Sequence, residues 1–281
     1  MASAEVDFLG AWAEPVGDVG RGFKNMMELV ITTSRLYNAF SVLGMAHRAC
    51  RVAADYADHR RAFGQPIGDF PLVRETLAWM LADTEAGLAG SWLLAGLQEA
   101  IDQGLASDTE RAFFRVALNV NKLRTAALAH DTINRGIEVL GGNGAIESFS
   151  VLPRLLRDNV VCENWEGTHN TLRVQVLRDC ARLGIHRGFF DYVEPILGAA
   201  VCAPVRAQLQ AALDAPPGLA TLLMRPAADG LATLTALAGL APLTDERIRL
   251  RAELTAARHL GGGPRVDADY LERVNACWRA E

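Results

Sequence analysis

The chain has 281 residues, 50% of them hydrophobic and 22% charged, a balance typical of globular proteins. Its formal net charge of −5 provides no positive field, so binding to nucleic acid or to an anionic lipid surface is not expected. No apolar stretch approaches the roughly 20 residues of a membrane helix, and Glu5 and Asp7 interrupt any signal peptide. We therefore expect a cytoplasmic protein with no membrane partner.

The first 20 residues differ from the rest of the chain. The stretch EVDFLGAW alternates loosely between apolar and polar positions, as a β-strand does, and PVGDVGRG is typical of a loop. A lone strand cannot satisfy its own backbone groups, so we expect residues 4–10 to pair with a segment outside this sequence.

From residue 22 onward, apolar residues recur with helical spacing. The predicted helices cover residues 22–60, 69–101, 107–140, a region from 151 onward, and 168–183. Asp69 is the expected cap of the second helix, with Pro71 in its first turn. Ser107 and Glu110 form the S-x-x-E pattern of a capping box, and the run GGNG ends the third helix.

Long amphipathic helices with short connections predict an all-α fold, an antiparallel up-and-down four-helix bundle over residues 21–186. Residues 187–281 are richer in Ala and Leu and contain shorter helices, which predicts a smaller helical domain for packing or assembly. Helix breaks are expected at residues 215–218, 225–230, 241–246 and 261–265.

Three segments together resemble signatures of the acyl-CoA dehydrogenase family. They are YADHRRAFGQPI (56–67), EVLGGNGAIESFSVLPRLLRD (138–158) and WEGTHNT (165–171). The resemblance implies that residues 1–20 are the end of a middle β-domain and that residues 21–186 are the family's C-terminal bundle. Residues 187–281 resemble the extra domain of acyl-CoA oxidases and of the alkylation-response branch.

The resemblance implies that Glu166 is the catalytic base, which removes the α-proton of an acyl-CoA thioester while hydride passes from the β-carbon to flavin N5. Trp165 would help to exclude water, as a general base requires. Gly167 would let the backbone approach the ligand, and the Glu166 N–H would bind the thioester carbonyl. The alternative is a solvated acid that the dipole of the next helix favours. Some members carry the base at the position of Ser34, whose hydroxyl cannot serve.

The resemblance also implies contacts with FAD and with CoA. The FAD contacts would be made by Arg60, Phe63, Glu138, Gly142, Thr168 and Asn170, and Arg35 would lie near the CoA adenine. Arg60 would bind the pyrophosphate and Phe63 would pack near the adenine of FAD in a neighbouring subunit. Glu138 departs from the glutamine of many members.

Each of these contacts except that of Glu138 has a purely structural alternative. Arg60 could pair with Asp58 on the surface, Phe63 could belong to the core, and Gly142 could be a helix C-cap. Thr168 and Asn170 could be N-capping residues, and Arg35 a surface cation.

Two functions remain open. The first is an FAD-dependent acyl-CoA dehydrogenase, or its C-terminal portion, acting as a homodimer or homotetramer without a metal and passing electrons to an electron-transfer flavoprotein or to oxygen. The second is a non-catalytic helical fragment or split subunit, completed by a partner that supplies the β-domain. A DNA-associated flavoprotein is disfavoured by the acidic charge balance.

Overall fold

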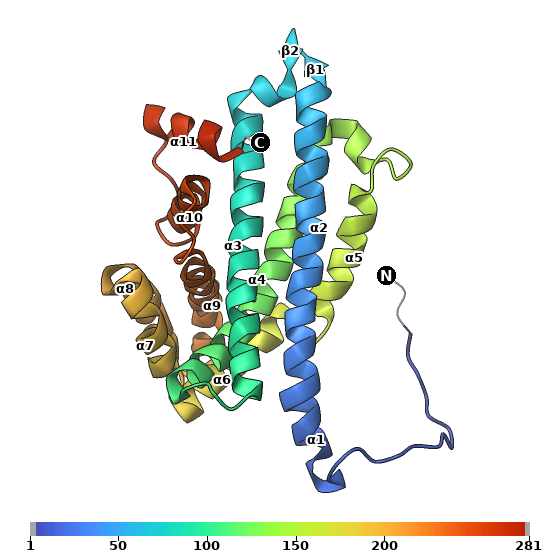
Figure 1. The fold of residues 1–281 in the computed structure, drawn as a ribbon, viewed down its shortest axis with the longest axis vertical. Coiled ribbons are helices and arrows are strands. Elements are labelled where there is room, and N and C mark those ends of the chain that lie inside the picture. The colour runs from blue at the N-terminus through green and yellow to red at the C-terminus, as the bar shows by residue number, and fades with distance from the viewer. Residues whose placement is uncertain (1–3, 279–281) are drawn as a thin grey trace.

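The computed structural model describes residues 4–278. Four long helices lie side by side along the long axis of the molecule (Figure 1). They are α2 (Thr32–His59), α3 (Pro71–Asp102), α4 (Asp108–Leu140) and α5 (Leu152–Asn164). The predicted all-α fold with an antiparallel four-helix bundle is confirmed.

The first long helix begins in three short pieces. These are η1 (Val19–Arg21), α1 (Gly22–Asn25) and the π-helical segment η2 (Met26–Ile31), which leads directly into α2. After α2 the chain makes a two-residue hairpin between β1 (Arg61–Ala62) and β2 (Gln65–Pro66), with Arg61 opposite Pro66. A turn of this kind needs positive φ at both central residues, and Phe63 (+51°) and Gly64 (+90°) provide it.

The start of α3 differs from the prediction. Its N-cap position is Phe70, which makes no side-chain cap, and Asp69 instead closes the short helix η3 (Ile67–Asp69). The Asp69 carboxylate accepts a hydrogen bond from Arg74 Nη2 at 3.0 Å, so it is engaged elsewhere. Pro71 needs no capping partner because it has no N–H.

The ends of α4 form as predicted. Ser107 Oγ accepts from the Glu110 N–H at 3.2 Å, and the Glu110 carboxylate accepts from the Ser107 N–H at 2.7 Å. At the other end Gly141 takes a φ of +63°, and η4 (Gly141–Ala145) follows. A Cβ on Gly144 would lie 2.4 Å from the Ile137 carbonyl oxygen, so only glycine fits there.

The N-terminal segment forms no strand. Residues 4–18 have no helix or strand and run as an extended trace away from the bundle (Figure 1). Val6, Phe8 and Trp12 are 68%, 81% and 82% exposed. Among the described residues the one sheet is the β1–β2 hairpin, and this segment does not pair with it. That residues 1–20 belong to a β-domain stays a prediction, and residues 1–3 lie outside the described part.

Six more helices follow the bundle: α6 (His169–Leu183), α7 (His186–Leu197), α8 (Ala199–Asp214), α9 (Pro217–Leu240), α10 (Glu246–His259) and α11 (Ala268–Trp278). The break predicted at residues 225–230 is wrong, because α9 continues through Pro226. Proline removes one helical hydrogen bond. The residues that follow it, including Ala227, Ala228 and Leu231, are completely buried, and their packing outweighs that loss.

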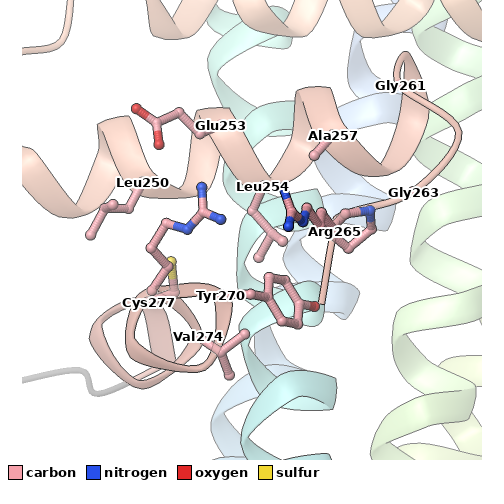
Figure 2. A pocket seen from close by; sticks show the side chains of 12 residues that line it. Leu250, Glu253, Leu254, Ala257, Gly261, Gly263, Arg265, Tyr270, Val274 and Cys277 are labelled. Carbon is pink, nitrogen blue, oxygen red and sulfur yellow. The ribbon is translucent and has the colours of Figure 1, made fainter. Parts of the chain in front are cut away.

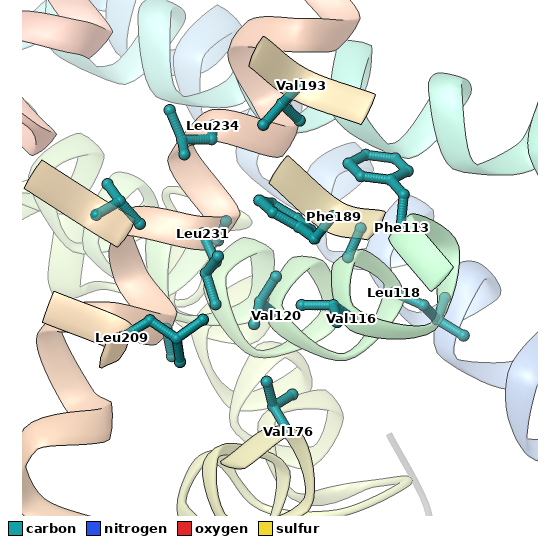
Figure 3. Close-up of a cluster of buried hydrophobic side chains, with 14 of the residues drawn as sticks. Phe113, Val116, Leu118, Val120, Val176, Phe189, Val193, Leu209, Leu231 and Leu234 are labelled. Atoms are coloured by element: carbon teal, nitrogen blue, oxygen red, sulfur yellow. The ribbon is translucent and has the colours of Figure 1, made fainter. Parts of the chain in front are cut away.

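The C-terminal helices share a core with the bundle (Figure 3). Phe113 of α4 stacks on Phe189 and Tyr192 of α7, with ring centroids 5.2 Å and 4.1 Å apart. Helices α3 and α9 approach so closely that a Cβ on Gly239 would lie 2.4 Å from the Ala89 backbone. The core therefore runs across the boundary predicted at residue 186. No helix among residues 4–278 is long and apolar enough to cross a membrane.

Candidate active site

Glu166 lies in a strained turn between α5 and α6. Within the described residues, the two non-glycine residues with positive φ are Glu166 (+53°) and Phe63 (+51°), both of them predicted site residues. Gly167 follows with a φ of +106°, and Thr168 then caps α6 by accepting from the Thr171 N–H at 3.5 Å. Such backbone conformations persist only where surrounding contacts hold them.

Both carboxylate oxygens of Glu166 are hydrogen-bonded to α2. Ser34 Oγ donates to Oε1 at 2.6 Å, and Asn38 Nδ2 donates to Oε2 at 3.1 Å. Ser34 and Asn38 are one helical turn apart, so they lie on the same face of α2. The carboxylate is half-buried, and the two donors fix the positions of its oxygens.

Arg35, between those two donors, binds the backbone of the turn. Its Nε and Nη2 donate to the Glu166 carbonyl at 3.3 and 3.1 Å. Two side chains accept the remaining hydrogen bonds: Gln175 Oε1 from Nη2 at 3.1 Å, and Asn119 Oδ1 from Nη1. Arg35 is 7% exposed. Burial lowers the pKa of Arg35, and the Glu166 carboxylate opposes that shift. The guanidinium is engaged inside the protein, so its contact with CoA stays a prediction.

Lys122 of α4 lies on the buried side of the same turn. Its Nζ donates to the carbonyls of Glu163 and Gly167 at 2.9 and 3.0 Å. Lys122, Asn38 and Asn119 were not predicted from the sequence as residues of this site. They are polar residues at helix positions that face the core, and this pattern indicates hydrogen-bond partners, which polar side chains need when they are buried.

Thr168 and Asn170 make local contacts at the start of α6. Thr168 acts as the N-cap, and Asn170 Oδ1 accepts from Arg173 Nη1 at 3.2 Å. Both residues are exposed, so their predicted contact with FAD stays a prediction.

The other predicted FAD contacts lie at the opposite end of the bundle. Arg60 and Gly142 line one concave surface of about 300 Å³, beside Tyr56 and Asn143. Phe63 stands at the tip of the β1–β2 hairpin, 96% exposed, so the structural alternative that it belongs to the core is wrong, and its contact with FAD stays a prediction. Glu138 is exposed on the last turn of α4. No ion pair joins Arg60 to Asp58 among the described side chains.

The two groups of residues are too far apart to meet in one chain. Ser34, beside Glu166, lies near the start of α2, and Arg60 lies just after its end. At a rise of about 1.5 Å per residue, the two residues are roughly 39 Å apart along the helix axis. Figure 1 shows the β1–β2 hairpin at one end of the bundle and α6 toward the other.

A further pocket, of about 350 Å³, lies between α10 and α11 (Figure 2). Leu254, Tyr270 and Val274 line it, and Arg265 lies at its edge. It contains none of the predicted site residues and lies apart from Glu166.

The structure is an all-α bundle with a carboxylate at the junction of α5 and α6, and comparison with known proteins identifies the family of this bundle. The family model described as acyl-CoA dehydrogenase, C-terminal domain, matches residues 20–180. The chain belongs to the acyl-CoA dehydrogenase family, as its three motifs predicted.

Individual relatives agree. Over 199 residues the chain is 37% identical to acyl-CoA dehydrogenase family member 11 of Caenorhabditis elegans, covering 70% of this chain and 32% of the relative. The structure of Caenorhabditis elegans ACDH-11 in complex with C11-CoA is 29% identical with a TM-score of 0.72, covering 93% of this chain and 48% of that chain. An acyl-CoA dehydrogenase from Bacillus anthracis, complexed with FAD, shares the fold at 20% identity with a TM-score of 0.68, covering 94% of this chain and 55% of that one. The chain spans about a third of the length of the curated relatives it matches (32% of each of two).

Proposed function

We propose that this chain is the C-terminal portion of an FAD-dependent acyl-CoA dehydrogenase and that Glu166 is its base. The observation that carries the proposal is the carboxylate held on Ser34 and Asn38 at a turn with positive φ. The family membership supports acyl-CoA as the substrate and FAD as the cofactor. When bound, FAD supplies the acceptor for the hydride that leaves the β-carbon.

The residues of this chain perform the proton transfer. Each Glu166 oxygen accepts one hydrogen bond from α2, which leaves lone pairs free to take the α-proton. The carbonyl of Glu166 points toward Arg35. In a trans peptide the N–H opposes the carbonyl, so the Gly167 N–H faces away from Arg35. Together with the Glu166 N–H, which is the donor predicted from the sequence, the Gly167 N–H would bind a thioester carbonyl.

The hairpin end of the bundle fits a dinucleotide. Arg60 is exposed beside the concave surface that Gly142 lines, and a Cβ on Gly142 would meet no atom within 4 Å. A phosphate can therefore approach this backbone, with the guanidinium as a charge-assisted donor. Arg60, Phe63 and Gly142 are the residues that would hold FAD at this end, and Thr168 and Asn170 at the other.

The distance between these two ends supports a dimer. A site that uses both ends requires two copies, in which the hairpin of one chain reaches the Glu166 end of its partner. The exposed Phe63 at the hairpin tip has the position that such a contact needs. A homotetramer built from two dimers, with electrons passing to an electron-transfer flavoprotein, is compatible with the same arrangement.

The second candidate function is a helical subunit completed by another protein that supplies the β-domain. The extended segment 4–18 favours it, since Phe8, Leu9 and Trp12 are at least 81% exposed (81%, 91% and 82%). Apolar side chains exposed in series mark a surface that another protein covers.

The absorbance spectrum of the chain after incubation with FAD and gel filtration tests both functions. Retained flavin that acyl-CoA bleaches, with bleaching lost in Glu166→Gln, supports the dehydrogenase. Glu163→Gln is the matched control, because the Glu163 carboxylate faces His130 and Asn159 instead. A colourless chain contradicts a cofactor site formed by this chain alone and favours the second function.

A further inference from the structure

Lys122 is the most deeply buried basic residue in the described part of the chain. The chain has 28 Lys and Arg residues, and its lysines are Lys24 and Lys122. Lys24 is exposed and pairs with Glu28 at 3.7 Å one helical turn away. Lys122 is completely buried, with 0% exposure, which is rare for a lysine unless its ammonium is paired and hydrogen-bonded.

The partners of Lys122 are backbone carbonyls on both sides of Glu166. Nζ donates to the Glu163 carbonyl, in the last turn of α5, and to the Gly167 carbonyl, just before α6 begins. The Glu163 carbonyl is among the last four of α5, which lack an intrahelical partner and carry the negative end of the helix dipole. The ammonium of Lys122 donates a hydrogen bond to this carbonyl and offsets its partial negative charge.

Arg35 supplies the third contact, to the carbonyl of Glu166 itself. Two buried cations, one from α2 and one from α4, thus bind three carbonyls of a five-residue turn. Their shapes suit their tasks. The planar guanidinium of Arg35 spans Glu166, Gln175 and Asn119, whereas the compact ammonium of Lys122 fits between two converging carbonyls.

We infer that Lys122 is a positioning residue of the proposed dehydrogenase, which clamps the backbone on both sides of Glu166 and so keeps its carboxylate on Ser34 and Asn38. The inference rests on the proposed function in one respect, that Glu166 is the base. The clamp acts through the backbone, so Lys122 itself touches neither substrate nor cofactor.

The electrostatics of Lys122 support the geometry. Burial lowers the pKa of Lys122 to about 8, and the Glu166 carboxylate is the largest influence that opposes this shift. Arg35 lowers the pKa further, while Cys162 and Glu163 raise it. The charges of Lys122 and Glu166 therefore stabilise each other.

The first test measures that coupling without changing Lys122. In a sample with isotope-labelled lysine the two side chains give two NMR signals, which Lys24→Met assigns. We expect the Lys122 signal to titrate near pH 8 and its midpoint to fall in Glu166→Gln, because the variant removes the charge that raises the pKa of Lys122. Glu28→Gln, which removes the partner of Lys24, is the control and should leave the Lys122 midpoint in place. An unchanged midpoint in Glu166→Gln would overturn the inference.

The second test removes the clamp. In Lys122→Met, which keeps the length of the side chain, we expect amide exchange in residues 163–168 to accelerate about tenfold or more relative to the middle of α4. Lys24→Met should leave it unchanged. Equal exchange in this segment for Lys122→Met and wild type refutes the clamp, and if Lys122→Met fails to fold, the titration of Glu166→Gln decides.

Neither test requires flavin. If the chain stays colourless with FAD while both tests succeed, the clamp stands and the proposed catalytic function of this chain alone fails. If flavin binds and acyl-CoA bleaches it while both tests fail, the function stands and Lys122 has only a packing role.

Discussion

Replacing Asp83 is expected to weaken the attachment of the C-terminal helices to the bundle. Asp83 of α3 is 3% exposed and binds two residues of α10, accepting from Arg258 Nη1 and His259 Nε2, both at 2.7 Å. Arg124 of α4 contacts His259 Nδ1 at 3.0 Å. Since arginine can only donate, Nδ1 is the acceptor, and the Nε2–H of His259 donates to Asp83.

The magnitude follows from what Asp83→Asn leaves behind. Removing one partner of a buried ion pair costs about 3–5 kcal/mol, because the other charge stays buried without compensation. Arg258 keeps its position over the Trp79 ring, 4.5 Å from the centroid, which retains part of its stabilisation. We therefore expect a loss near the lower limit, about 3 kcal/mol. At about 2–4 °C per kcal/mol, this corresponds to a fall in Tm of roughly 6–12 °C.

The assay is thermal and urea unfolding followed by circular dichroism. Asp69→Asn is the matched control, since Asp69 also accepts from an arginine, Arg74, at 3.0 Å but is 47% exposed. Surface pairs contribute about 0–1 kcal/mol, so the control should unfold close to wild type. Asp83→Asn with a Tm within 2 °C of Asp69→Asn would refute the reasoning. A double-mutant cycle with Arg258→Met should give a coupling of about 1 kcal/mol or more.

The same carboxylate predicts an acid-dependent loss of stability. Burial alone would raise the pKa of Asp83, but the hydrogen bond from His259 and the charge of Arg258 hold it below its ordinary value. The unfolded chain then binds the proton more readily than the folded one. The stabilisation is therefore complete above about pH 4 and is lost as pH falls through the folded pKa. Between pH 6 and pH 3, wild type should lose more Tm than Asp83→Asn, and parallel profiles would contradict this assignment.

Three further predictions concern other parts of the molecule. Gly239→Ala should destabilise the protein by about 2 kcal/mol or more, because the new Cβ would lie 2.4 Å from the α3 backbone. The control is Gly218→Ala in the same helix, whose Cβ would meet nothing within 4 Å, so this variant should be neutral or stabilising. Equal denaturation midpoints for the two variants would refute the close α3–α9 contact. Phe63→Ser should leave the unfolding midpoint unchanged, since the side chain is 96% exposed, but should weaken self-association measured by sedimentation velocity. A similar loss of self-association in Leu72→Ser, at a side chain that is 76% exposed, would show that the contact is not specific to the hairpin tip. Ser107→Ala should cost about 1 kcal/mol of urea stability through the lost capping box, and a change below about 0.3 kcal/mol would mean that the cap contributes little.

Local chemistry in the sequence was sufficient for most of the helices. The capping box at Ser107 and the end of the third helix at GGNG were predicted, as was the N-capping alternative for Thr168, because each depends on residues only a few positions apart. The family motifs also placed Glu166 at the start of a helix. These features need no knowledge of distant contacts.

Tertiary contacts decided the rest. Proline predicts a break at Pro226, yet the helix continues because the residues after it are buried. Asp69 has the chemistry of a cap, but its carboxylate binds Arg74, and Arg74 is itself held by Asn275 of α11. Apolar residues near Phe8 have the pattern of a strand, but a strand forms only where another strand pairs with it.

The surroundings of Glu166 show the limit most clearly. Ser34 and Asn38 lie 132 and 128 positions away in the chain, and Lys122 reaches the same turn from a third helix. The sequence identified the acid from its neighbours. The packing of α2 and α4 against the turn determines which donors bind the Glu166 carboxylate and which cations bind the backbone of the turn. The sequence alone could not show this, because these contacts join residues that are far apart in the chain.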